Sequence, residues 1–405
     1  MMLLKIAWRN LLRNKRRSLI VLTSIIVGVT ALLLNDSIGR GMINQMLNNQ
    51  LDSYYTHIQI HHDGFLDDKS VKHYIDNSDE IESKLKNAKY IENYSKRTVS
   101  FGLFSSAMNS TGISMIGIDP ELEKHVTNID ESITEGRYLS GKEREAVIGA
   151  ALAEKLEVKL GDKVVAVANS LDGDVASELY RVVGIYKTAS SNFEKMYVYV
   201  SLKTSQRMLG VGDGVMEFAM TTNNTEMIDQ YQNDLQSMMP EGTKVSSYKE
   251  LLPMMMSYIE MYDSTVYIFY AVIIAAVLFG IINTILMSVF ERVQEIGVLM
   301  SIGMKKGKIF IMILQEAFLL GVAGTVAGFI IGYAIYLPLS MNGIDFSFYS
   351  DSLSSWGLGS IMYPELDLQG ILNILLIMPF ASVLGAIYPA IKAMRLQPTD
   401  AMKYV

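Results

Sequence analysis

The sequence predicts an α-helical membrane protein with four transmembrane helices and an α+β extracytoplasmic domain between the first two of them. Half of the 405 residues are apolar, and the mean hydropathy is positive, at +0.24. Four segments supply the roughly 20 predominantly apolar residues that a transmembrane helix needs. Lys and Arg cluster beside these segments on one side only, as expected for a protein oriented in a membrane.

The chain divides into nine predicted segments. They are a cytoplasmic basic N-terminal segment (1–17), transmembrane helix 1 (18–40), an extracytoplasmic α+β domain with stalk helices at both ends (41–262), transmembrane helix 2 (263–290), a cytoplasmic loop with a short helix (291–308), transmembrane helix 3 (309–337), an extracytoplasmic loop (338–370), transmembrane helix 4 (371–391) and a cytoplasmic C-terminal tail (392–405).

The direction of the chain follows from its Lys and Arg residues. The cations near the span ends are Lys5, Arg9, Arg13, Lys15, Arg16, Arg17, Arg292, Lys305, Lys306, Lys308, Lys392, Arg395 and Lys403. The loop 338–370 contains no Lys or Arg. Both termini are therefore predicted to be cytoplasmic.

The first apolar segment has a second interpretation. A basic start followed by an apolar run is also typical of a cleaved signal peptide. The small-residue triplet after Leu34 is Ser37-Ile38-Gly39, which is a weak cleavage site. We therefore interpret the segment as a retained anchor.

Composition excludes several classes of site. The chain has no cysteine, which excludes disulfides, thiolate metal sites and cysteine catalysis. The net charge is −7, and because the cations gather beside the spans they indicate membrane orientation and no nucleic-acid partner.

The segment 41–262 mixes helix and strand patterns. Strands are predicted at 57–61, 146–148, 163–168, 180–186 and 196–200, and helices at 79–88 and 150–156. Gly161 and Gly173 mark turns. A middle lobe is expected near residues 110–200.

Apolar stripes at helical spacing flank this domain. They consist of Ile43, Leu47, Leu51 and Tyr54 at one end and Leu251, Met255, Tyr258 and Tyr262 at the other. Because Pro253 stands where a first-turn proline is tolerated, we predict that both stripes continue the spans outward as a stiff two-helix stalk. Two ordinary amphipathic helices closing the domain are the alternative.

The segment 291–303 predicts a short amphipathic helix along the cytoplasmic membrane face. Its charged residues come first, and its apolar residues lie on another side. The charged face can dock a soluble partner, and an interfacial helix without a partner is the alternative. Gly297 and Gly303 permit close backbone approach.

The sequence lacks the motifs that are typical of nucleotide-binding and hydrolytic sites. No phosphate-binding Gly-x-x-x-x-Gly-Lys-Ser/Thr run and no Gly-x-Ser-x-Gly elbow occur, so no cofactor and no catalytic residue are predicted. His57, His61 and His62 form a histidine cluster in which His57 and His61 share one face of a strand and Asp63 is near. A metal site needs three or four ligands that converge at tight distances, and an exposed strand end is expected there instead.

The third span carries small residues at three- and four-residue steps. They are Gly321, Gly324, Gly328 and Gly332. Such a stripe permits close helix packing, within the chain or against a second permease. Asn283 and Glu316 are polar residues near membrane depth, where ionisable groups are usually paired or functional.

The chain resembles the ABC transporter permeases of the FtsX, MacB and LolC/LolE superfamily. The resemblance rests on Ala7–Ser18, on Asn283–Gly303, on Glu316–Gly328 and on Tyr388–Ala401, in the family's order. The domain between the first spans looks like a MacB-like periplasmic domain. Gly117–Pro120, Ala146–Gly149 and Tyr197–Ser201 look most like the lipoprotein-releasing LolC/LolE branch.

The resemblance implies a mechanotransmission scheme. Two permeases pair as a homodimer or heterodimer, and separate ATPase subunits, which bind ATP and magnesium, dock on their coupling helices. By match to the motif, Glu291, Arg292, Glu295 and Gly297 are expected in the docking region. The permease itself is then no enzyme.

In the lipoprotein-releasing branch, the acylated substrate enters between the first and second spans, and a periplasmic carrier receives it. A possible acyl-chain groove is formed by Met254, Met255, Tyr258 and Met261, with Met256 beside them, although core packing between the stalk helices explains these residues too. Asn169–Ser177 is a candidate carrier loop, and a plain hairpin turn is its alternative.

Other functions stay open at the level of sequence. They are a MacB-like efflux permease working with a periplasmic adaptor, an FtsX-like regulator of an outer enzyme, and a receptor without an ATPase. The receptor is disfavoured because the cytoplasmic parts are too small to signal alone.

Overall fold

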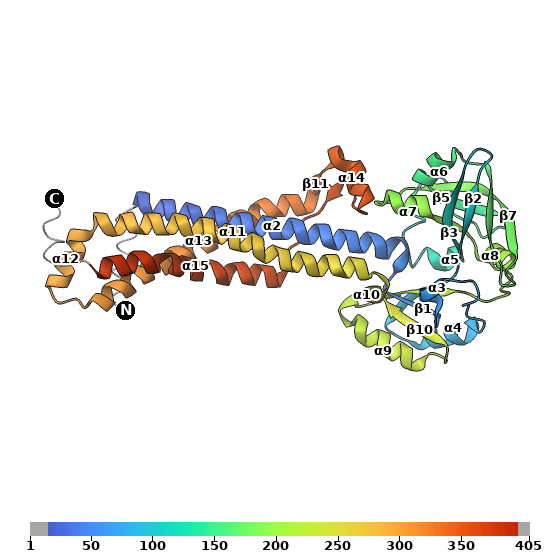
Figure 1. Ribbon diagram of the computed structural model, residues 1–405, viewed down its shortest axis with the longest axis horizontal. Coiled ribbons are helices and arrows are strands. Elements are labelled where there is room, and N and C mark those ends of the chain that lie inside the picture. Colours follow the sequence, from blue (N-terminus) through green and yellow to red (C-terminus); the bar gives the residue numbers. More distant parts are fainter. Residues whose placement is uncertain (1–14, 396–405) are drawn as a thin grey trace. The chain divides into compact units, whose positions relative to one another are not determined.

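The computed structural model describes residues 15–395 of the chain. The predicted cations Lys5, Arg9, Arg13 and Lys403, and part of the motifs at either end, lie outside the described residues. The chain forms two compact units (Figure 1). The helical unit contains the described residues up to 43 together with 258–344 and those from 362 onward, and the α/β unit contains 44–257 and 345–361.

Four helices are long and apolar enough to cross a membrane. They are α2 (Lys15–Gln50), α11 (Pro253–Glu291), α13 (Lys306–Asn342) and α15 (Leu368–Met394). At 1.5 Å per residue, even a helix of 27 residues is about 40 Å long, against a hydrocarbon core of about 30 Å. The predicted spans are thus confirmed as helices, and α11 begins at Pro253 without a break before the span.

The helices of the helical unit pack side by side around one apolar core (Figure 1). Glycines on α13 bring it against its neighbours: a Cβ at Gly324 would lie 2.7 Å from Ile25 Cγ2, and one at Gly321 would lie against Ser382 of α15. Thr30 donates a hydrogen bond across the helices to the Gly328 carbonyl at 3.1 Å. The small-residue stripe is therefore a packing face within the chain.

Gly328→Ala is expected to destabilise this bundle by about 1–3 kcal/mol, the usual cost of overpacking. Its Cβ would meet Val29 Cβ at 2.8 Å and the Ile26 carbonyl at 3.0 Å, so α2 and α13 must separate. The measurement is thermal unfolding of the purified chain in detergent. Gly307→Ala, on the same helix with no neighbour within 4 Å, is the control, and an equal melting temperature for the two variants would contradict the packing role.

The α/β unit is built from ten strands and short helices. The strands are β1 (Ile58–His62), β2 (Ile91–Ser105), β3 (Ser110–Ile118), β4 (Ile133–Gly136), β5 (Glu145–Gly149), β6 (Lys163–Asn169), β7 (Val175–Tyr186), β8 (Tyr197–Ser201), β9 (Glu217–Thr222) and β10 (Thr243–Ser247). The helices are the π-helix η1 (Leu51–Tyr55), α3 (Phe65–Asp68), α4 (Ser78–Asn87), α5 (Pro120–Glu123), α6 (Ala150–Leu156), α7 (Ser191–Met196), α8 (Leu202–Leu209), the 3₁₀ helix η2 (Thr225–Met227), α9 (Ile228–Met238) and α10 (Tyr248–Leu251).

The long strand β2 is shared by two lobes. Its second half belongs to a ring of hydrogen-bonded strands in the order β2, β3, β8, β5, β7 and β6, which β6 closes by pairing with β2. Its first half is the edge of the sheet β10–β1–β9–β2. Ile81 and Leu85 of α4 and Leu235 of α9 bury their side chains in the core of this second lobe.

The predicted elements of this unit are confirmed. The strand and helix predictions fall on β1, β5, β6, β7, β8, α4 and α6. Gly161 and Gly173 adopt positive φ values of 89° and 90°, which only glycine accepts readily. The candidate carrier loop lies in the β6–β7 hairpin, as the hairpin-turn alternative expected.

The segment between α13 and α15 has structure that sequence patterns did not reveal. It contains β11 (Ile344–Asp345), η3 (Ser347–Tyr349), α14 (Ser350–Ser355) and β12 (Ile361–Met362). The side chain of Gln45 on α2 donates a hydrogen bond to the Ile361 carbonyl at 3.0 Å. The segment is therefore folded onto the end of α2 that belongs to the α/β unit.

Candidate transport and coupling site

An open apolar groove runs between α2 and α11 within the helical unit. It has a volume of about 620 Å³ and is lined by Leu19, Ile20, Thr23, Ser24, Val27, Gly28, Ala31, Val272, Ile273, Ala276 and Val277. The hydroxyls of Thr23 and Ser24 donate to carbonyls of their own helix, at 2.7 and 3.0 Å. The groove therefore offers a hydrocarbon-like surface that suits acyl chains.

A charged junction ties three helices together in the same unit. Arg40 of α2 contacts Asp36 at 3.2 Å, Asp367 at 3.7 Å and Asp263 of α11 at 3.9 Å. Asp367 caps α15, since it accepts a hydrogen bond from the Gly370 amide at 3.0 Å. Asp36 is buried and pairs with Arg40 within α2, whereas Asp263 and Asp367 are 56% and 40% exposed, so the contacts that Arg40 makes between helices are partly exposed.

The short helix between the second and third spans, α12 (Val293–Ser301), is anchored by Arg292. This guanidinium lies 3.2 Å from a carboxylate oxygen of Glu316 on α13 and 3.2 Å from one of Glu295 on α12. The Arg292 and Glu316 side chains are only 10% and 13% exposed. Val298 and Ile302, in contrast, have their side chains exposed. Arg292 therefore joins α12 to α13 through its two ion pairs.

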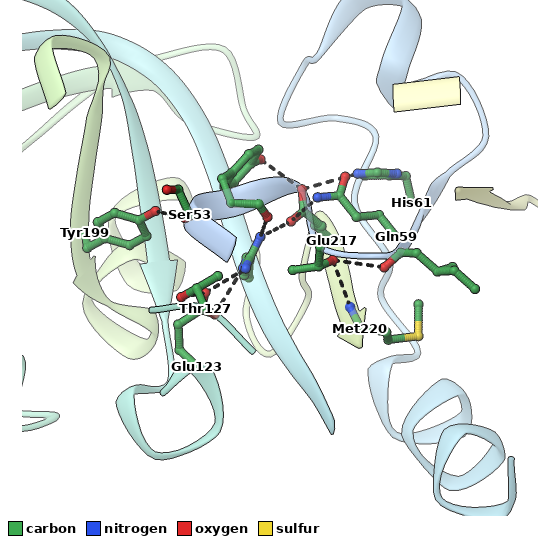
Figure 2. A network of polar contacts seen from close by, with 12 residues as sticks. Ser53, Gln59, His61, Glu123, Thr127, Tyr199, Glu217 and Met220 are labelled. Atoms are coloured by element: carbon green, nitrogen blue, oxygen red, sulfur yellow. Dashed lines mark hydrogen bonds and ion pairs between the residues drawn. The ribbon is translucent and has the colours of Figure 1, made fainter. Parts of the chain in front are cut away.

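A second buried network holds the other end of α2, in the α/β unit. Figure 2 shows Ser53, Glu123 and Glu217 converging from three parts of the chain. Arg97 of β2 binds Glu123 through two nitrogens, at 2.6 and 3.0 Å, and Glu217 through a third at 2.6 Å. Each of these side chains is at most 1% exposed.

The network satisfies the carbonyls that end α2. A helix leaves its last carbonyls without intrahelical partners, and here α2 finishes as the π-helix η1. Arg97 donates to the Tyr54 carbonyl at 2.7 Å and Tyr199 donates to the Ser53 carbonyl at 2.9 Å. Side chains of the α/β unit thus bind two backbone carbonyls at the end of α2 and hold this helix end in place.

Further polar side chains complete the network around its two carboxylates. Tyr54, Gln59 and Thr127 donate hydrogen bonds to them, and the ring of His61 lies 3.3 Å from a carboxylate oxygen of Glu217. Gln59, His61 and Thr127 are labelled in Figure 2. Burial by itself would raise the pKa of Glu217, but Arg97, with smaller contributions from His61 and Tyr54, lowers that pKa below its ordinary value. Glu217 is therefore held as a carboxylate at neutral pH.

The α/β unit is expected to lose stability in acid because of Glu217. A carboxylate whose folded-state pKa is depressed stabilises the fold above its ordinary pKa of 4.5 and loses this contribution as the pH falls through the folded-state value. The measurement is the melting temperature between about pH 7 and pH 3. Glu217→Gln should flatten this dependence and the exposed Glu241→Gln should not, and parallel curves for all three proteins would contradict the assignment.

Among residues 15–395, no group of three or more His, Asp or Glu side chains is placed to hold a metal ion. The residues described above instead fix helix ends and line a groove, which suits binding and movement.

Comparison with known families decides what the chain is. The family described as MacB-like periplasmic core domain matches residues 18–238, which is more than half of the chain. The family described as FtsX-like permease C-terminal matches residues 267–398. The chain belongs to the ABC transporter permeases of the LolC/LolE, MacB and FtsX superfamily.

The permease is similar to named relatives over nearly its whole length. It is 22% identical to the lipoprotein-releasing system transmembrane protein LolC of Neisseria meningitidis serogroup B, over 98% of this chain and 99% of the relative. It is 21% identical to LolE of Haemophilus influenzae, over 98% of each. The periplasmic region of MacB from Actinobacillus actinomycetemcomitans is 15% identical and covers 52% of this chain and 96% of its own, with a TM-score of 0.36.

The predicted docking residues of the permease lie around the start of α12. Glu291 and Glu295 are exposed, whereas Arg292 and Gly297 are buried. Arg292 thus holds α12 in place through Glu316 and Glu295. We infer that any docking surface consists of the exposed side chains of α12.

The residues predicted to line a substrate groove differ in exposure. Met254 and Met261 are 71% and 60% exposed and Tyr258 is half-buried, and their spacing places the three on one face of α11. Met255 is 3% exposed. A groove at these residues stays a prediction, and the apolar groove described above lies farther along α11, at residues 272–277.

The permease has functional residues that sequence patterns did not single out. No motif or periodic pattern included Arg97, Glu123 and Glu217, which are far apart in the sequence. Asp36 and Arg40 did carry a signal, since opposite charges four residues apart at the end of an apolar helix indicate a buried pair. The expectation of an exposed strand end for the histidines was wrong at His61, which is buried because its ring bonds Glu217 at 3.3 Å.

Proposed function

We propose that the chain is the permease subunit of an ABC complex that extracts lipoproteins from the inner membrane and passes them to a carrier. The observation that carries this proposal is the apolar groove between α2 and α11, which is open along the two helices expected to admit an acylated substrate. The near-full-length similarity to proteins named LolC and LolE supports the same substrate class.

In this proposal, separate ATPase subunits dock beneath α12 and supply the energy. Movement of the ATPases displaces α12, and the Arg292–Glu316 ion pair transmits this displacement to α13. The helices α2 and α11 transmit the movement toward the α/β unit. There, Arg97 binds the Tyr54 carbonyl at the end of α2. The permease supplies binding and motion, and it hydrolyses nothing itself.

The proposal also includes the orientation and the partners of the permease. The termini and α12 lie on the cytoplasmic side, because the cations gather there and 338–370 has none. A second permease, identical or related, completes the transmembrane pathway, since a groove that is open along one side needs a second wall.

Depletion of the protein in its native cell tests the substrate class. Acylated lipoproteins are expected to accumulate in the inner membrane, as measured by membrane fractionation and labelling of their acyl chains. Unchanged lipoprotein sorting would rule out lipoprotein release.

Filling the groove tests the route of the acyl chain. Ala276→Trp places an indole in the groove, and we expect release of an acylated lipoprotein from reconstituted vesicles to fall at least tenfold. Ala275→Trp adds the same ring at an exposed position next to it that does not line the groove. Equal release by the two variants would show that the acyl chain takes another path.

A further inference from the structure

A cavity of about 460 Å³ lies inside the α/β unit, apart from the groove between the transmembrane helices. Its walls come from four segments: the end of α2 with η1 (49–55), the loop at 128–132, the segment 187–197 around α7, and residues 355–357 after α14. Cavities of this volume commonly hold ligands of small-molecule size.

Hydrogen bonds between the walls hold the cavity open. Asn49 of α2 donates to the Gly357 carbonyl at 2.9 Å. Asn192 of α7 donates to the Ser355 carbonyl at 3.1 Å. These bonds join three of the four segments, so the cavity is preformed and a ligand need not order it on binding.

The lining is rich in amide and hydroxyl groups and has a single charge. That charge is Lys187, and no Asp or Glu lines the cavity. Asn128 is one of the amide residues in the wall.

We propose that this cavity binds an extended polypeptide segment of neutral or acidic character, such as the chain that follows the acylated end of a cargo protein. The identity of the cargo rests on the function proposed above, but binding of a peptide does not. A peptide backbone alternates N–H donors and C=O acceptors, which amide side chains match. Lys187 favours an acidic residue over a basic one.

The aromatic side chains favour a peptide over an oligosaccharide. Sugars bind on the free faces of aromatic rings, but Phe193 and Tyr197 stack on each other with centroids 4.4 Å apart. Tyr197 also packs against Tyr54 at 4.9 Å. These two rings therefore offer little free surface to a sugar, whereas Trp356 in the same wall is 59% exposed, so an oligosaccharide is included among the probes below. The polar lining likewise disfavours an acyl chain.

Trp356 allows a direct test because the chain has only one other tryptophan, Trp8. In the full-length Trp8→Phe protein in nanodiscs, Trp356 in the cavity wall is the sole tryptophan, and excitation beyond the absorption band of tyrosine selects it. The probes are an unacylated eight-residue peptide with one acidic residue, the same peptide with Lys in its place, and a linear tetrasaccharide.

We expect saturable binding of the acidic peptide, weaker binding of the basic one and none of the sugar. Asn128→Ala should weaken binding about fivefold, as the loss of one hydrogen bond predicts, and Lys187→Glu should reverse the charge preference. Asn87→Ala, exposed at the end of α4, is the matched control.

Binding of the sugar alone, or no saturable change with any peptide, would overturn the proposal. Because no ATPase and no acylated cargo are present, this result is independent of lipoprotein release. Peptide binding together with normal lipoprotein sorting after depletion would refute only the proposed substrate class.

Discussion

Arg292→Glu is expected to reduce ATP-driven cargo release at least tenfold while the permease still inserts into the membrane. The guanidinium joins α12 to α13 through Glu316 at 3.2 Å, in surroundings that leave both side chains nearly buried. Reversing the charge places three carboxylates together and separates the two helices. The ATPase then still hydrolyses ATP, but its motion no longer reaches α13.

The measurement is release and ATP hydrolysis in vesicles that contain the full complex. Arg292→Glu combined with Glu316→Arg should recover much of the release, because the pair is restored in reverse. Lys308→Ala, exposed at the start of α13, should release cargo at the normal rate. Normal coupling in Arg292→Glu, or failure of the reversed pair together with normal assembly, would show that α12 acts by another contact.

Arg97→Met is expected to destabilise the α/β unit by about 3–5 kcal/mol, the usual cost of removing one partner from a buried ion pair. Two carboxylates, Glu123 and Glu217, would keep their burial and lose their shared cation. The Tyr54 carbonyl would lose its donor as well. The end of α2 should therefore fray in addition to the loss of stability.

Hydrogen exchange and thermal unfolding of the full chain in detergent measure these effects. Faster exchange is expected at the amides of η1, β2 and β9. Arg97→Lys should recover only part of the stability, because an ammonium cannot bind Glu123 through two parallel bonds. Lys249→Met, which removes an exposed pair with Asp229, should cost less than about 1 kcal/mol. Equal melting temperatures for the two methionine variants would refute the role of Arg97.

The local sequence pattern was sufficient to predict a helix or a strand wherever a single segment determines its own conformation. The runs of apolar residues in α2, α11, α13 and α15 predicted helices because an isolated backbone in lipid must satisfy its own hydrogen bonds. Alternating polarity predicted β1, and runs rich in Val and Tyr predicted β6 and β7. In β1 four consecutive residues are buried, so that strand has both faces covered. The pattern at 291–303 likewise predicted α12.

Sequence alone determined the four spans, the intervening α/β domain and the family, because these depend on periodicity and on motifs within short segments. Only the tertiary structure decided that Arg97 meets Glu123 and Glu217, that Arg292 turns inward to Glu316, and that an apolar groove lies between α2 and residues 272–277 of α11. The physical reason is that a buried charge is stable only beside partners brought from distant parts of the chain, and a single sequence does not state which of its charges will meet.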